Sequence, residues 1–143
     1  MRALPGVEET ALSASAPFHN VVIPNRVRVA EDGADAVEIR AADAWVSPEY
    51  FATVGVRLLA GRTVRSDEMF HRLTSGPEPV AIVSRAVARR LFGTDDPIGR
   101  RIASQLPGPP ARVIGVAEDS RWSSLADEGR EPLVYRPLPS AAA

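Results

Sequence analysis

The apolar residues of this chain occur in short runs, and this brevity constrains the fold most. The clearest run is VIGVA at residues 113–117, which predicts a buried strand. Residues 80–83 (VAIV) and 133–137 (LVYRP) predict two more strands, and proline ends the last one. No run approaches the ~20 apolar residues that a membrane helix needs. We therefore expect a globular domain that does not itself insert into a membrane.

Two alternating segments near the N-terminus predict a half-buried hairpin. They are residues 27–29 (VRV) and 37–40 (VEIR), in which apolar and charged residues alternate. Residues 31–35 (EDGAD) lie between them, and the central Asp-Gly pair is typical of a hairpin turn.

A helix followed by a strand is predicted after this hairpin. Ser47 is placed to cap the helix, Pro48 suits its first position, and Gly55 suits its end. Residues 56–59 then predict a short strand that turns at residues 61–62. The side chains of Tyr50, Phe51 and Val54 are expected on one side of the helix, with Tyr50 and Phe51 as core anchors.

The next unit repeats this order of elements. Ser84 follows the apolar run at 80–83 and is placed to cap a second helix that Gly93 ends. Residues 94–97 predict a turn, residues 98–102 a strand, and residues 107–110 (PGPP) a loop. The expected apolar row of this unit has a spacing of four residues and contains Val83, Val87 and Leu91.

These elements predict an α+β fold of mixed small sheets with two or three short helices. A length of 143 residues fits a single domain, 1–143, with residues 139–143 as a frayed tail.

Charge and composition exclude several classes of protein. Seventeen basic residues, all arginine, are balanced by eighteen acidic ones, which argues against nucleic-acid binding. The absence of cysteine excludes disulfides, thiolate nucleophiles and cysteine-based zinc sites.

No group of residues has the spacing of a catalytic, cofactor or metal site. His19 and His71 stand far apart in sequence, and no nucleophile elbow or phosphate loop is present. Glu118 and Asp119 follow a predicted strand, but adjacent residues in an extended chain point to opposite faces, so we interpret them as solvated turn residues. We expect a solvated, ion-paired face at arginines 85, 89, 90, 100 and 101. Trp45 and Trp122 fit either a core or an interface.

Several short motifs resemble the MacB-like periplasmic core domain of ABC transporter permeases. They are VSPEYF at 46–51, LLAGR at 58–62, VAIVS at 80–84, ARRLF at 88–92, DPIGR at 96–100, VIGVA at 113–117 and VYRP at 134–137. Their order and spacing agree with the family across residues 44–138. The positions at which we expect the framework of this domain are Tyr50, Phe51, Gly61, Arg62, Gly99, Gly115, Tyr135 and Pro137.

The resemblance implies a non-catalytic role outside the cytoplasmic membrane. Such domains lie between the first two membrane helices of a permease that an ATPase subunit drives, and they contact a second copy or a periplasmic adaptor. They have two lobes, of which this chain would contain one fully and part of the other. The missing membrane helices, ATPase motifs and upstream strand–helix unit imply a fragment of a longer permease.

The residues themselves leave a second interpretation open. A freestanding soluble domain that binds a peptide or small ligand would have the same composition and the same absence of a reactive cluster. The resemblance identifies neither the transported substrate nor the partner.

Overall fold

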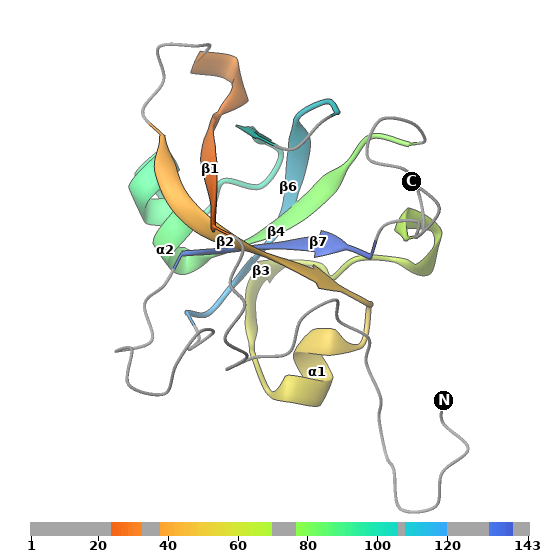
Figure 1. The fold of residues 1–143 in the computed structure, drawn as a ribbon. Coiled ribbons are helices and arrows are strands. Elements are labelled where there is room, and N and C mark those ends of the chain that lie inside the picture. Colours follow the sequence, from red (N-terminus) through yellow and green to blue (C-terminus); the bar gives the residue numbers. More distant parts are fainter. Residues whose placement is uncertain (1–23, 33–37, 70–76, 106–107, 120–131, 139–143) are drawn as a thin grey trace, which may run out of the picture.

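The computed structural model describes residues 24–32, 38–69, 77–105, 108–119 and 132–138, in which one mixed sheet is accompanied by short helices (Figure 1). The α+β class predicted from the sequence is confirmed. The strands are β1 (Pro24–Val29), β2 (Ile39–Val46), β3 (Leu58–Gly61), β4 (Val80–Ser84), β5 (Arg101–Ser104), β6 (Ala111–Ala117) and β7 (Leu133–Pro137). The helical segments are α1 (Tyr50–Val54), α2 (Arg85–Val87), the 3-10 turns η1 (Ala30–Asp32) and η2 (Ser66–Glu68), and the π-helical segment η3 (Ala88–Phe92).

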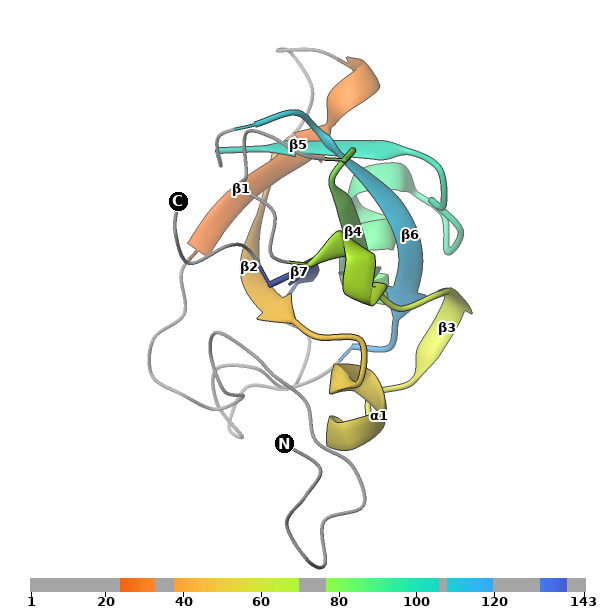
Figure 2. The ribbon, with the colours of Figure 1, turned by 90° about the vertical axis from the view of Figure 1, so that its right-hand side faces the viewer.

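The seven-stranded sheet closes on itself. Its order is β3-β6-β4-β7-β2-β1-β5, and β5 also pairs with β6, so that all strands except β3 form a ring. Strand β6 pairs with two different strands along the same edge. Ala111 and Arg112 pair with β5, whereas residues 115–117 pair with β3. Figure 2 shows β2, β1, β5 and β6 following one another around this ring. Closure of this kind fixes the register of the strands relative to one another.

Side-chain alternation along the ring strands creates two separate hydrophobic cores. Successive residues of a strand point to opposite faces, so a strand that is buried on both sides contributes to both cores. Strand β7 does so, with Val134 inside the ring and Tyr135 outside it. The inner core consists of Val27, Ala41, Ala81, Val83, Val87, Ala88, Ile102, Ala111, Val113, Val116 and Val134. The outer core consists of Ala42, Ala44, Val46, Tyr50, Phe51, Val64, Val80, Ile82, Ile114, Ala117, Leu133 and Tyr135.

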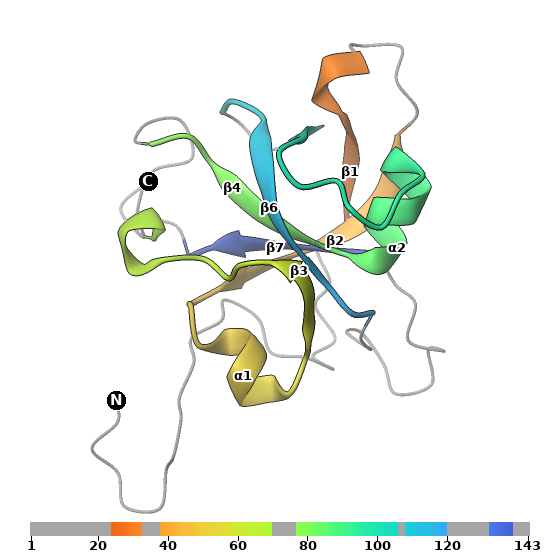
Figure 3. The ribbon, with the colours of Figure 1, turned by 180° about the vertical axis from the view of Figure 1, so that it is seen from behind.

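The two helical segments cover different cores. Tyr50 and Phe51 of α1 belong to the outer core, while Val87 of α2 and Ala88 of η3 belong to the inner one. Figures 1 and 3 accordingly show α1 and α2 on different sides of the sheet. Segments α2 and η3 lie where β4 ends and β7 begins, because the hydroxyl of Ser84 accepts hydrogen bonds from the backbone N–H groups of Val87 and Leu133. They therefore close one end of the ring.

The helix predicted from Ser47 begins later than expected. The N–H of Tyr50 donates to the carbonyl of Ser47, so residues 47–50 form a turn, and Glu49 precedes the first helical residue without a side-chain cap. Tyr50 and Phe51 are buried as expected, whereas Val54, predicted on the same side of the helix, is 41% exposed. A helix of five residues makes little more than one turn, and only its first two residues reach the core. Gly55 ends the helix in the left-handed conformation, as predicted.

The boundaries of four predicted strands are also shifted along the chain. Strand β3 begins at Leu58 rather than at residue 56, because the N–H groups of Gly55 and Val56 both donate to the carbonyl of Phe51 and prolong the helix end. Strand β5 begins at Arg101, after a turn in which the N–H of Arg100 donates to Pro97. The hairpin strands are longer than expected, at 24–29 and 39–46. The predicted strands at 80–83, 113–117 and 133–137 and the Ser84 cap are confirmed.

Candidate functional site

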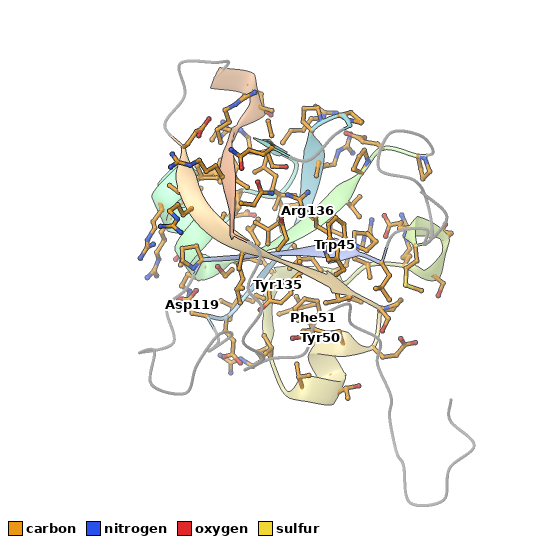
Figure 4. The ribbon with its side chains drawn as sticks, viewed as in Figure 1. Trp45, Tyr50, Phe51, Asp119, Tyr135 and Arg136 are labelled. Atoms are coloured by element: carbon orange, nitrogen blue, oxygen red, sulfur yellow. The ribbon has the colours of Figure 1, made fainter. Side chains whose placement is uncertain are left out.

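Three of the framework residues form an aromatic cluster in the outer core. Tyr50 and Phe51 of α1 and Tyr135 of β7 are all buried. The ring of Phe51 meets that of Tyr135 edge-on with 4.8 Å between centroids, and the rings of Tyr50 and Phe51 are 5.4 Å apart. In Figure 4 these three side chains lie together on one side of β7. The cluster fastens α1 to the ring, since edge-on aromatic pairs are favoured beyond their buried area.

Three more framework residues meet where β3 runs beside β6. Gly61 and Gly115 face each other across the two strands. Strand β3 ends at Gly61, and the N–H of Arg62 donates to the carbonyl of Ile114, so the chain still lies against β6 at the residue after the strand. The guanidinium of Arg62 holds Glu68 through two hydrogen bonds of 2.8 and 3.0 Å. This pair anchors η2 beside the end of β3.

The remaining framework residues lie apart from these two groups. Gly99 has a positive φ of 91°, and its N–H donates to the carbonyl of Val113. Pro137 is the last residue of β7 and pairs with Val46. The expected framework is therefore spread over several contacts of the sheet.

The burial of Tyr50 makes the stability of the domain sensitive to alkaline pH. Burial, and then the neighbouring Tyr135, raise the pKa of the Tyr50 phenol above its ordinary value. A tyrosine in the unfolded chain ionises near pH 10, so the folded state holds the proton more tightly. The contribution of Tyr50 to stability is therefore fully present below about pH 10 and is lost as the pH rises above it.

The sequence makes this alkaline transition simple to measure. The chain has two tyrosines and contains neither lysine nor cysteine, so few groups titrate near pH 10. We expect the free energy of unfolding, measured in urea from pH 8 to pH 11, to decline above about pH 10. The Tyr50→Phe variant should decline less steeply. An equal decline in both proteins would contradict this assignment.

A second cluster, which we call the buried polar cluster, consists of Asn25, Asp43 and Arg136. These side chains come from β1, β2 and β7 and are 5%, 7% and 8% exposed. The Nε of Arg136 donates to Oδ1 of Asp43 at 2.9 Å, and Nδ2 of Asn25 donates to Oδ2 of the same carboxylate at 2.7 Å. The Oδ1 of Asn25 accepts from the N–H groups of Arg26 and Gln105. A buried charge pair is therefore tied to the backbone of β1 and to that of the residue after β5.

Strand alternation places the buried polar cluster inside the ring. Asn25 lies two residues before Val27, Asp43 two after Ala41, and Arg136 two after Val134, and all three neighbours belong to the inner core. The cluster therefore lies at the end of the ring opposite to α2 and η3. Figure 4 shows Arg136 on the other side of β7 from the aromatic cluster.

Trp45 joins the buried polar cluster at its edge. It pairs with Arg136 across β2 and β7, and the guanidinium carbon of Arg136 lies 5.9 Å from the centre of its ring. Trp45 is half-buried, so it contributes both to the interior and to the surface. The Nη2 of Arg136 is buried and has no hydrogen-bond partner in the part of the chain that the structure describes. An unsatisfied donor of this kind costs about 1–3 kcal/mol, and more when it is charged.

Removal of the negative charge in this cluster should destabilise the domain. Asp43→Asn keeps the shape of the side chain but leaves the guanidinium of Arg136 uncompensated, so we expect a loss of about 1.5–3 kcal/mol in the free energy of unfolding. Glu78→Gln is the matched control, because Glu78 pairs with Arg101 and Arg112 at the surface. It should cost less than about 1 kcal/mol. Equal losses in urea unfolding of the two variants would contradict the distinction.

The acidic residues after β6 have structural partners. Oε1 of Glu118 accepts from the N–H of Arg57, and Oδ1 of Asp119 accepts from the N–H of Ala86 in α2. The interpretation of both as solvated turn residues is therefore wrong, because each is half-buried and satisfies a backbone donor. Figure 4 shows Asp119 near α2.

The ion-paired face predicted for the arginines is present in part. Arg89 pairs with Asp95 at 2.7 Å and Arg101 with Glu78 at 2.8 Å, while Arg100 lies over the ring of Phe92. Arg85 differs, since its Nε is buried without a partner. The histidines 19 and 71, Trp122 and the tail at 139–143 lie outside the described residues. Within those described, no group of three or more histidine, aspartate and glutamate side chains is gathered closely enough to hold a metal ion.

The sequence interpretation did not single out Asn25, Asp43 or Arg136. Two of them carry a signal that could have been used, because a charged residue inside a buried strand requires a partner. Asp43 interrupts the apolar segment 41–46, and Arg136 follows the apolar residues 133–135. Nothing in the sequence indicates that these two positions are neighbours.

Together these features define a closed α+β domain with a buried polar cluster inside its ring. The chain belongs to the family of MacB-like periplasmic core domains, whose model matches residues 1–143. No curated protein matches the chain. Among the described residues, no helix has the length and apolar character required to cross a membrane.

Two solved structures have a similar fold. One is the periplasmic region of MacB from Actinobacillus actinomycetemcomitans, with 19% identity, a TM-score of 0.58 and a match over 90% of this chain and 48% of that one. The other is the extracellular domain of the noncanonic ABC-type transporter YknZ from Gram-positive bacteria, with 23% identity, a TM-score of 0.60 and a match over 95% and 57%. The chain thus spans about half the length of each.

Proposed function

We propose that this chain is a single, non-catalytic domain on the outer face of the cell membrane, within an ABC transporter permease. In this role it passes the ATPase-driven movement of the membrane helices to a second copy of the permease or to a periplasmic adaptor. The observation that carries the proposal is the family match over residues 1–143. The permease helices, the ATPase subunit and the transported substrate belong to the proposal and lie outside this chain.

The physical basis of the proposed transmission is the stiffness of the closed ring. Hydrogen bonds join its six strands on both sides, and each of its two cores is packed against a different helical segment. A force applied at one strand is therefore shared by its neighbours instead of being absorbed by local bending. In this proposal the framework residues attach the outlying elements to the ring. Phe51 and Tyr135 hold α1 against β7, and the contact between Gly61 and Gly115 holds β3 against β6.

The proposal predicts movement of the domain during the ATPase cycle. The chain contains no cysteine, so one introduced cysteine gives a single labelling position once cysteines elsewhere in the permease are replaced. Ile98, which is 41% exposed, is a suitable position for a spin label. We expect the distance between labels on two copies to change between the nucleotide-free and the ATP-trapped permease.

The control for this measurement is a permease whose ATPase cannot bind nucleotide. It should show the nucleotide-free distance under both conditions. If the active permease also keeps one distance distribution throughout the cycle, the domain does not transmit movement and the proposal is wrong.

A freestanding domain that binds a peptide or small ligand is the second candidate function. The observation that favours it is the unsatisfied Nη2 of Arg136, a buried donor without an acceptor. The genes beside this reading frame discriminate between the two candidates. An adjacent ATPase and membrane helices support the permease, and unrelated neighbours support the freestanding domain.

A further inference from the structure

The guanidinium of Arg136 is only partly used by the residues around it. A carboxylate usually engages both Nε and Nη2 of an arginine through its two oxygens. Here Oδ1 of Asp43 accepts from Nε, while Oδ2 is taken by Nδ2 of Asn25. The pair is therefore one-armed, and Nη2 has no acceptor among the described residues.

The charge at this end of the ring selects the kind of acceptor that Nη2 can take. Asp43 and Arg136 carry opposite charges and contact each other. The other side chains that strand alternation directs to this part of the interior are uncharged, namely Asn25, Trp45 and Ser104. An anion would be attracted by the guanidinium of Arg136 but repelled by the adjacent carboxylate of Asp43. It would also lose its hydration shell, which costs free energy. A neutral carbonyl oxygen accepts the same hydrogen bond without these costs.

Trp45 supplies the second part of the site. Its ring lies beside the guanidinium of Arg136, and the side chain is half-buried. Aromatic side chains of this kind, apolar and partly exposed, are enriched where proteins bind other chains. The Nη2 atom is shielded from solvent, so an incoming group has to displace part of the cluster's surface. Trp45 is the half-buried member and is expected to move.

We propose that Arg136 Nη2 and the ring of Trp45 form a binding site for a backbone carbonyl of an extended, uncharged peptide segment from a partner. The carbonyl accepts from Nη2, and the segment packs against the indole ring. The inference stands on the geometry of the buried polar cluster and does not depend on coupling to an ATPase.

A neutral peptide tests the site directly. The 143-residue chain with Trp122→Phe leaves Trp45 as its one tryptophan, and acetyl-trialanine-amide serves as the probe. We expect saturable shifts of the Arg136 side-chain N–H signals in NMR spectra and a parallel change in Trp45 fluorescence. Sodium acetate at equal ionic strength should give neither. The NMR measurement needs no change at Arg136 and so holds even where a variant fails to fold.

Matched variants assign the binding to this position. Arg136→Lys keeps a positive charge beside Asp43 but removes Nη2, and we expect at least tenfold weaker binding. Arg40→Lys is the control, since Arg40 is an exposed residue of β2 on the opposite face from Asp43. It should bind as the parent does. Saturation by acetate instead of the peptide, no response to either probe, or equal weakening in both variants would each overturn the proposal.

Discussion

Replacement of Gly61 by alanine is expected to destabilise the domain by more than about 4 kcal/mol, a loss that few single substitutions reach. A Cβ atom at this position would overlap the carbonyl oxygen of Ile114 and lie 2.7 Å from the Cα of Gly115. Both obstacles are backbone atoms of β6, which is paired on its other side with β4. The two strands would have to separate, because neither can yield by a rotation of a side chain.

Gly55→Ala is the matched control for this prediction. Gly55 has a φ of 77°, close to the 74° of Gly61, but nothing lies within 4 Å of its added Cβ. The Gly55→Ala substitution therefore costs only the free energy of placing alanine in a left-handed conformation, about 1–2 kcal/mol. Urea unfolding of both variants isolates the steric contribution. Similar losses in the two would show that β3 does not lie as close to β6 as described.

Phe51→Ala should cost about 3–5 kcal/mol. The side chain is 4% exposed and contacts the rings of Tyr50 and Tyr135. Its removal leaves a cavity between α1 and β7, and it also removes one partner from each aromatic pair. Because α1 has only five residues, it has few other contacts with which to hold its place on the ring.

Val54→Ala provides the control within the same helix. Val54 is 41% exposed, and the change to alanine favours the helix slightly. We expect a change within about 0.5 kcal/mol, measured as thermal and urea stability alongside Phe51→Ala. A negligible loss for Phe51→Ala would mean that α1 is not fastened to the outer core.

The sequence predicted the central strands and missed how they close. Strands β4, β6 and β7 are buried on both faces, and such strands consist of continuous apolar residues that stand out in the sequence. The closure depends on β5, whose Arg101 and Ile102 pair with Arg112 and Ala111 of β6. Only one of these two pairs is apolar, so no extended hydrophobic pattern pointed to this contact. The alternation of apolar and charged residues in the sequence also could not show that both faces of β2 are buried. The residues that cover its second face come from strands far away in sequence.

The buried polar cluster was unpredictable for a related reason. Asn25, Asp43 and Arg136 come from three strands, and only the ring brings them into contact. Their spacing along the chain resembles no motif. The framework residues, in contrast, lie inside short motifs, and the closest contacts among them join α1 to β7 and β3 to β6.

The central claim is that this segment works outside the cytoplasmic membrane as part of a permease. The most direct test is to place a cysteine at Val54, which is 41% exposed, and to treat intact cells that produce the full permease with a membrane-impermeant thiol reagent. A cysteine at Val83, which is fully buried, is the control and should stay unmodified until the protein is denatured. We predict modification at position 54 in intact cells. Modification only after the cells are lysed would place the domain on the cytoplasmic side and contradict the account.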